Sequence, residues 1–157
     1  MRIGFGFDSH RFGVDRPLRL AGVAIPHESG LVGHSDGDAV AHAVTDAVLG
    51  AAALGDIGSL FPDTDPAWKD ADSMELLAEA MRRVVAAGFR VQNVDVTVIC
   101  RAPRIRPHAD AMRVRLADVL GIPVGAVSVK GKTNEGMDAL GRGEGLAVHV
   151  AALLIGS

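Results

Sequence analysis

The chain has 157 residues, of which 48% are hydrophobic and 22% charged, and its formal net charge is -3. This size and balance predict one domain over residues 1–157 and give no reason to expect a nucleic-acid or membrane partner. Cys100 is the only cysteine, the apolar stretches fall short of the roughly 20 residues of a membrane span, and the N-terminus is typical of a strand rather than a signal peptide, so we expect a cytoplasmic protein without disulfides.

The first part of the chain predicts a hairpin followed by a helix. Residues 2–10 and 18–25 are typical of strands, and the turn-forming segment 13–17 joins them. An alanine-rich helix is predicted over about 37–54, starting beside two candidate caps and ending before a glycine. The candidate caps are Ser35 and Asp36. Segment 55–66 carries two prolines, two glycines and three acids, which predict a loop.

The rest of the chain continues to alternate helices and strands. A helix is predicted to begin at Asp72, whose spacing to Glu75 matches a capping box, and to end at Gly88. There follow a strand over 94–99, a helix ending at Leu120, and strands over 126–131 and 145–155 joined by an irregular polar loop. This order predicts an α/β (α+β) sandwich, with a mixed sheet covered on one face by helices. The other face carries apolar side chains, which we expect a homo-oligomer to cover. They are Ile3, Phe5 and Phe7.

Three residues form a candidate metal site. Asp8 and His10 lie two residues apart on the first predicted strand, so their side chains point to the same face. With His42 from the first predicted helix, they have the composition of a zinc site that keeps an open position. Asp46 lies one helical turn after His42 and is expected to hold its imidazole in one tautomer. The alternatives are a surface pair for Asp8 and His10 and a helix-surface pair for the other two.

Two further features can hold an anion. His34 and Ser35 precede the first predicted helix, where free N–H groups and the helix dipole favour negative charge. The alternative for Ser35 is an ordinary helix cap. A local basic cluster can also hold phosphate. Its members are Arg101, Arg104 and Arg106.

The run Gly131, Lys132 and Thr133 does not form a Walker A loop. Such a loop needs a glycine five positions earlier, and position 126 is alanine. Lys132 and Thr133 can still donate to phosphate oxygens, and Glu135 can help to hold a harder cation such as Mg²⁺. The alternative is a solvated hairpin loop.

Five motifs occur in order along the chain, at residues 6–10 (GFDSH), 34–38 (HSDGD), 55–58 (GDIG), 60–65 (LFPDTD) and 141–144 (GRGE). Together they resemble the 2-C-methyl-D-erythritol 2,4-cyclodiphosphate synthase family of the non-mevalonate isoprenoid pathway, over residues 2–154. The resemblance implies a phosphorus-oxygen lyase acting on 4-diphosphocytidyl-2-C-methyl-D-erythritol 2-phosphate. The 2-phosphate would attack the β-phosphorus, expel CMP and close a cyclic diphosphate.

The resemblance also implies roles for individual residues. Zinc would be held by Asp8, His10 and His42, and Mg²⁺ or Mn²⁺ by Glu135. The phosphates would be stabilised in the transition state by His34 and Thr133. The erythritol part would contact Asp56, Ile57, Gly58, Phe61, Pro62, Asp63, Thr64 and Asp65. The cytidine and its phosphate would contact Cys100, Arg101, Ala102, Pro103, Arg104, Ile105, Arg106 and Lys132. Further substrate contacts would come from Ser9, Ser35, Asn134, Ala139 and Arg142.

The family resemblance further implies a homotrimer with active sites at its subunit interfaces. Phe5, Phe7 and Arg142 would line a central cavity that holds an isoprenoid-like diphosphate; alternatively, Arg142 pairs with Glu144 of a neighbouring protomer. Two other functions remain open from the residues alone. The Asp/His/His set can serve a metal-dependent phosphohydrolase that activates water, or a non-catalytic zinc-stabilised oligomer, although the latter normally has four protein ligands.

Overall fold

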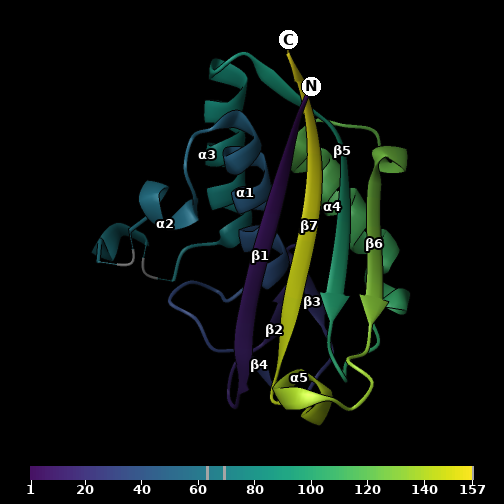
Figure 1. The fold of residues 1–157 in the computed structure, drawn as a ribbon. Helices are drawn as coiled ribbons and strands as arrows, with labels where there is room; N and C mark the ends of the chain where they lie inside the picture. Colours follow the sequence, from purple (N-terminus) through teal and green to yellow (C-terminus); the bar gives the residue numbers. More distant parts are fainter. Residues whose placement is uncertain (63, 69, 157) are drawn as a thin grey trace.

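The structure is a computed structural model that describes residues 1–62, 64–68 and 70–156. Asp63, an expected substrate contact, lies outside the described residues. The strands are β1 (Arg2–Gly13), β2 (Leu18–Leu20), β3 (Val23–Ile25), β4 (Gly30–Leu31), β5 (Phe89–Ile99), β6 (Val127–Lys132) and β7 (Gly145–Gly156) (Figure 1). The α-helices are α1 (Ala39–Ala52), α2 (Ile57–Leu60), α3 (Ser73–Ala86), α4 (Ala109–Leu120) and α5 (Asp138–Arg142). Short 3₁₀ turns cover Pro66–Trp68, Arg106–His108 and Val124–Ala126.

The main sheet is mixed, as the sequence predicted. Its strand order is β4-β1-β7-β5-β6, in which β5 and β6 are parallel and the other neighbours are antiparallel. The long strands β1 and β7 pair along most of their length, and this register sets Asp8 opposite Val148 and His10 opposite Leu146. Strands β2 and β3 form a separate two-stranded sheet. The α+β architecture of the prediction is therefore confirmed.

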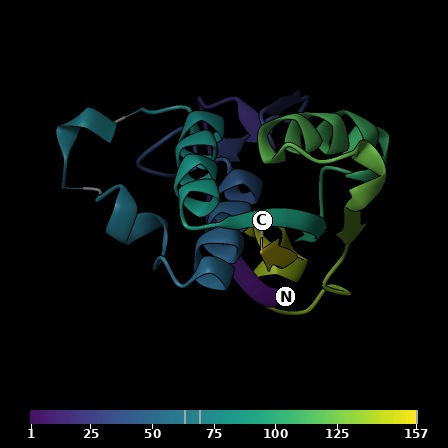
Figure 2. The same ribbon diagram turned by 90° about the horizontal axis from the view of Figure 1, so that it is seen from above.

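Helices α1, α3 and α4 lie on one side of the sheet (Figure 2). Helix α1 packs directly on β1 because two glycines of the strand face it. A Cβ added at Gly6 would lie 1.8 Å from the main-chain oxygen of Ala43, and one at Gly4 would lie 1.8 Å from that of Ala47. The small side chains on both surfaces thus bring helix and strand backbones close together. None of the helices in the described part of the chain is long and apolar enough to cross a membrane.

The opposite sheet face carries exposed apolar side chains, as predicted. Ile3, Phe5 and Phe7 are 80%, 65% and 49% exposed, while the alternate residues of β1 face the helices. The rings of Phe5 and Phe7 lie 5.7 and 5.1 Å from that of His149 on β7. An aromatic cluster of this size in contact with water is typical of a surface that binds a partner.

The predicted N-terminal hairpin is wrong, because residues 18–25 fold back on themselves. Ala21 and Gly22 have φ values of 53° and 71°, and they form the tight turn between β2 and β3. Two successive positive φ values match the two-residue turns of hairpins. Strand β1 pairs instead with β7 and with β4.

Helix caps also differ from the prediction. The side chain of Asp38, rather than Ser35 or Asp36, caps α1 by accepting from the N–H of Ala41. The segment 55–66, predicted as a loop, contains the single turn of α2, whose cap is Asp56. The loop between β6 and β7, predicted to be irregular, contains α5. The Asp56 cap stabilises α2 locally. Both α2 and α5 are too short to show the periodic pattern by which a helix is predicted.

Candidate active site

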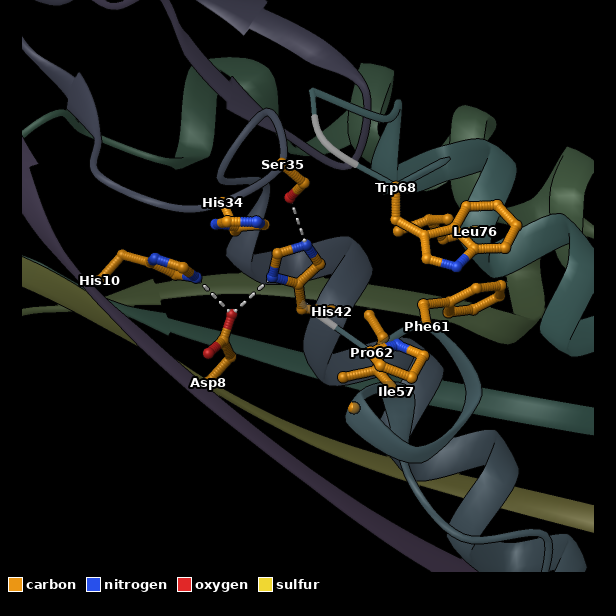
Figure 3. Close-up of a pocket in the computed structure, with 11 residues that line it drawn as sticks. Asp8, His10, His34, Ser35, His42, Ile57, Phe61, Pro62, Trp68 and Leu76 are labelled. Atoms are coloured by element: carbon orange, nitrogen blue, oxygen red, sulfur yellow. Dashed lines mark hydrogen bonds and ion pairs between the residues drawn. The ribbon is translucent and has the colours of Figure 1, made fainter. Parts of the chain in front are cut away.

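The three predicted metal ligands meet where the first turn of α1 passes β1 (Figure 3). Their candidate ligand atoms all lie within 4.8 Å of one another. Asp8 Oδ2 is 2.8 Å from His10 Nε2 and 3.0 Å from His42 Nδ1. Asp8 and His10 come from alternate positions of β1, and His42 comes from α1. The structure thus brings together all three residues that the sequence singled out.

The outer nitrogen of each imidazole is held by a neighbouring group. His10 Nδ1 lies 2.6 Å from the carbonyl oxygen of Val32, which can only accept, so this nitrogen carries a proton. His42 Nε2 lies 2.8 Å from Ser73 Oγ and 3.0 Å from Ser35 Oγ. The nitrogens that remain, Nε2 of His10 and Nδ1 of His42, are the two that face Asp8. This is the arrangement that metal-binding histidines adopt.

Charge in this cluster is set by the shared carboxylate. Burial alone raises the pKa of Asp8, but hydrogen bonds from His10 and His42 outweigh it and lower that pKa to about 2. The hydrogen bond to Asp8 raises the pKa of His10, and burial offsets part of this increase. The carboxylate therefore stays ionised at neutral pH and attracts either protons or a cation to the cluster.

The carboxylate of Asp46 does not have the predicted role. Its Oδ1 accepts a 2.8 Å hydrogen bond from the N–H of Ile57, at the start of α2. Within the described residues, neither ring nitrogen of His42 is bound to it. Asp46 thus anchors the helix that carries part of the cavity wall, and burial raises its pKa. The group behind His42 is Ser73, a residue that no sequence spacing indicated.

A cavity of about 390 Å³ opens beside the candidate metal ligands. Its polar side is formed by Asp8, His10, His34, Ser35 and His42, and its other side by Ile57, Gly58, Phe61, Pro62, Trp68 and Leu76. The rings of Phe61 and Trp68 stand edge to face, with centroids 4.9 Å apart. Such a cavity suits a ligand with an anionic end and a small carbon skeleton.

Four of the eight predicted erythritol contacts line this cavity. Ile57, Gly58, Phe61 and Pro62 do so, whereas Trp68 and Leu76 were missed. The carboxylate of Asp56 instead caps α2 by accepting from the main-chain N–H and hydroxyl of Ser59, and these bonds lower its pKa. Asp65 accepts from the N–H of Ala67. Thr64 and Asp65 are absent from the described lining of this cavity.

A second cavity, of about 210 Å³, lies where β5 and β6 end. Most of the predicted cytidine contacts line it. The lining residues are Cys100, Arg101, Pro103, Arg104, Ile105, Arg106, Gly131, Lys132 and Thr133. Three arginines and a lysine make the surroundings cationic, which favours a phosphorylated ligand. Burial raises the pKa of Cys100 to about 11, so its thiol stays protonated at neutral pH.

Glu135, the residue predicted to hold the second cation, lies next to this cavity. Thr133 donates a 3.1 Å hydrogen bond to the Glu135 carboxylate, and both line a further hollow with Arg101, Asn134 and Arg142. Ala102 and Arg142 line an adjoining hollow with Arg101. Ser9 and Ala139 lie together in another, which shares His10 with the cavity beside the metal ligands. Arg142 pairs with Glu144 of the same chain at 2.6 Å.

The cavity beside the metal ligands and the cavity at the ends of β5 and β6 share no lining residue in the described part of the chain. The first is built on β1, α1 and α2, the second on the ends of β5 and β6. Strand β7 lies between β1 and β5 in the sheet. A single copy of the chain therefore presents the predicted metal ligands and the predicted cytidine contacts as two separate half-sites.

Known proteins resemble this chain in sequence and in fold. The model of the YgbB family matches residues 1–155. The 2-C-methyl-D-erythritol 2,4-cyclodiphosphate synthase of Erwinia tasmaniensis is 59% identical over 155 residues, with 99% of each chain covered. The bifunctional IspDF from Campylobacter jejuni has a TM-score of 0.96 and 46% identity, covering 99% of this chain and 42% of that chain. A solved 2C-methyl-D-erythritol-2,4-cyclodiphosphate synthase in a CDP-bound form has a TM-score of 0.90 and 42% identity, covering 98% of this chain and 100% of that chain.

Proposed function

This chain belongs to the YgbB family, and we propose that it acts as a 2-C-methyl-D-erythritol 2,4-cyclodiphosphate synthase. It converts 4-diphosphocytidyl-2-C-methyl-D-erythritol 2-phosphate into the cyclic diphosphate and CMP. This is the reaction of a phosphorus-oxygen lyase in the non-mevalonate route to isoprenoids, carried by a single catalytic domain in the cytoplasm. The observation that carries the proposal is the Asp8, His10 and His42 cluster at the mouth of a half-apolar cavity.

The residues of this cluster fit a Zn²⁺ ion. One carboxylate oxygen and two imidazole nitrogens lie close enough to bind one ion, and their neighbours leave the inner nitrogens free. Three protein ligands of this kind are typical of zinc sites that keep one position for substrate. Glu135 would help to hold Mg²⁺ or Mn²⁺ with the diphosphate. When bound, these cations offset the negative charge that develops on the phosphate oxygens during the reaction.

Each of the two half-sites binds a different part of the substrate. His34 and Ser35 take the 2-phosphate, and the wall formed by α2 and its neighbours takes the methylerythritol carbon chain. Lys132 and the arginines of the second cavity take the cytidine and its phosphate. Thr133 donates to the diphosphate, so that His34 and Thr133 stabilise charge at the two ends of the reacting group.

The reaction itself requires little covalent chemistry from the protein. A 2-phosphate oxygen forms a bond to the β-phosphorus, and the bond from that phosphorus to the CMP oxygen breaks. Since the phosphate is already an anion near neutral pH, no proton has to be removed from the nucleophile. Holding both groups of one molecule in line supplies most of the acceleration. The protonated thiol of Cys100 is consistent with a binding role in this scheme.

We also propose that the chain forms a homotrimer with its active sites at the subunit interfaces. The two half-sites of one copy are separate, so a complete site needs the second cavity of a neighbouring copy. The exposed apolar face of β1 supplies the surface for this contact. Phe5, Phe7 and Arg142 then line a central cavity for an isoprenoid-like diphosphate. Size-exclusion chromatography with and without farnesyl diphosphate, on the parent and Arg142→Ala, tests this; no binding to the parent contradicts it.

The activity is tested by ³¹P nuclear magnetic resonance with the cytidylated substrate and Mg²⁺. The parent protein is expected to yield CMP and the cyclic diphosphate in equal amounts, and His42→Ala is expected to yield neither. His108→Ala is the matched control, because that imidazole lines neither the cavity beside the metal ligands nor the cavity at the ends of β5 and β6. Release of inorganic phosphate would indicate a phosphohydrolase instead. Unchanged substrate with folded, zinc-loaded protein would indicate a non-catalytic oligomer.

A further inference from the structure

A buried pair of hydroxyl groups lies behind His42, on the side away from Asp8. Ser73, the first residue of α3, is fully buried, and its Oγ is 2.8 Å from His42 Nε2. Ser35, from the loop before α1, is 8% exposed, and its Oγ is 3.0 Å from the same nitrogen. These contacts link α1 to the loop that precedes it and to the start of α3, which is 31 residues from His42 in the sequence. The Ser73 hydroxyl is the closer of the two to the ring, and the carboxylate of Asp36 also binds it.

Asp36 fixes the direction of the Ser73 hydroxyl. The main-chain N–H of Ser73 donates to Asp36 Oδ2 at 3.1 Å, and its hydroxyl donates to Asp36 Oδ1. A carboxylate only accepts, so the hydroxyl proton of Ser73 points to Asp36 and its lone pairs point to His42. His42 Nε2 must then be the donor. In a neutral ring this leaves the lone pair on Nδ1, which lies 3.0 Å from Asp8 Oδ2.

We propose that Ser73, oriented by Asp36, is a positioning residue that holds His42 in the tautomer able to bind a metal ion through Nδ1. This role rests on the proposed metal site. It mirrors the role of the Val32 carbonyl for His10, where an obligate acceptor also fixes the outer nitrogen. Metal-binding histidines commonly depend on such a partner.

Ser35 does not fix the tautomer in this way. Its Oγ lies 3.3 Å from Ser73 Oγ and accepts a 3.4 Å hydrogen bond from the N–H of Gly37. No carboxylate binds this hydroxyl among the described residues, so its proton can turn towards either neighbour. A hydroxyl that is free to turn can serve His42 as donor or as acceptor, whereas the Ser73 hydroxyl serves only as acceptor.

Zinc affinity of the purified protein, measured by competition with a chromophoric chelator, tests the proposal. Ser73→Ala removes only the hydroxyl and is expected to weaken Zn²⁺ binding by about 10-fold to 100-fold. Thr45→Val is the matched control. Thr45 is a fully buried hydroxyl residue of α1, but its hydroxyl donates to the carbonyl of Ala41 in the same helix. This control is expected to bind zinc as the parent does, so a general loss of packing is distinguished from loss of the Ser73 hydroxyl.

A second readout follows the ring itself. Long-range ¹H–¹⁵N correlation spectra of metal-free protein are expected to show a proton on His42 Nε2 in the parent. In Ser73→Ala the Nε2 proton is expected to be lost in part, in favour of a proton on Nδ1, which lies 3.0 Å from the Asp8 carboxylate. Asp36→Asn replaces an acceptor oxygen by an amide donor and leaves Ser73 in place. Like Ser73→Ala, it is expected to weaken zinc binding. It replaces Ser73→Ala as the test variant if that protein does not fold.

The outcomes separate this role from the metal site itself. A parent that binds zinc, with Ser73→Ala equal to it in affinity and tautomer, overturns the role of Ser73 and leaves the metal site standing. Failure of the folded parent to bind zinc overturns both. A loss of affinity in Ser73→Ala and Asp36→Asn, without one in Thr45→Val, supports the role.

Discussion

Replacing Asp38 by alanine tests how α1 is anchored below the candidate metal site. The carboxylate is fully buried and accepts three main-chain N–H bonds. The bond from Ala41, at 3.0 Å, caps α1, and those from Ala21 and Gly22, at 2.8 and 2.6 Å, hold the turn between β2 and β3. One side chain therefore joins the β2–β3 sheet to the helix that carries His42.

The magnitude follows from these bonds and from the burial of the charge. A hydrogen bond to an ionised acceptor contributes about 1.5–3 kcal/mol, so three would contribute roughly 4.5–9 kcal/mol if desolvation cost nothing. Burial raises the pKa of Asp38 despite its three N–H donors, so desolvation cancels much of that gain. We expect Asp38→Ala to lower the free energy of unfolding by about 3–5 kcal/mol. At about 2–4 °C per kcal/mol, Tm falls by roughly 6–20 °C.

The assay is urea-induced unfolding at neutral pH with a chelator present, so that loss of a bound ion does not contribute. Asp72→Ala is the matched control, because Asp72 caps α3 at an exposed position and accepts one 2.8 Å bond from Met74. That change is expected to cost about 1 kcal/mol. If the two substitutions destabilise equally, the buried three-bond anchor does not have the role argued for it.

Glycine packing, proton competition and thiol burial each give a further expected outcome. Gly6→Ala places a Cβ 1.8 Å from a main-chain oxygen of α1 and should cost about 3 kcal/mol in urea unfolding. Gly125→Ala, with nothing within 4 Å, should change little. The hydrogen bond to Asp8 raises the pKa of His10. The contribution of His10 to the free energy of unfolding is therefore fully present below pH about 6.5 and is lost as pH rises through the raised pKa. Thermal melts of metal-free protein should therefore show Tm falling as pH rises over this range, while zinc affinity rises because protons compete less. If Tm and zinc affinity rose together, the raised pKa of His10 would be contradicted. Cys100, whose pKa burial raises to about 11, should react with a thiol dye in urea but not in the native protein at pH about 8, and rapid native labelling would show an open thiol.

The predictable part of the site is the part that follows from local periodicity. Strand alternation puts Asp8 and His10 on one face whatever the strand pairs with, and the small-residue pattern around His42 predicts a helix that can approach closely. The same alternation predicts the exposed Phe5 and Phe7. These inferences needed no knowledge of the sheet order.

The unpredicted part depends on contacts between distant segments. The i+4 spacing correctly makes Asp46 and His42 neighbours on α1, but it does not say that α2 lies nearby and offers the N–H of Ile57. Ser73 lies 31 residues from His42, and only the packing of α3 against α1 brings them together. The hairpin error has the same origin, because a turn through Ala21 and Gly22 is stabilised by Asp38, far along the chain.

The metal ligands and the helix packing are tied together by the geometry of one strand. Gly6 lies against Ala43 and Gly4 against Ala47, so α1 runs antiparallel to β1. Two strand residues advance about 6.6 Å and four helix residues about 6 Å, so the two elements stay in register over this distance. Two residues further along β1 lies Asp8, opposite the first turn of α1, which contains His42. A one-residue slip of β1 would place phenylalanine against the helix and turn the ligands to the open face. The glycine contacts that stabilise the fold and the cluster proposed to bind zinc therefore select the same register.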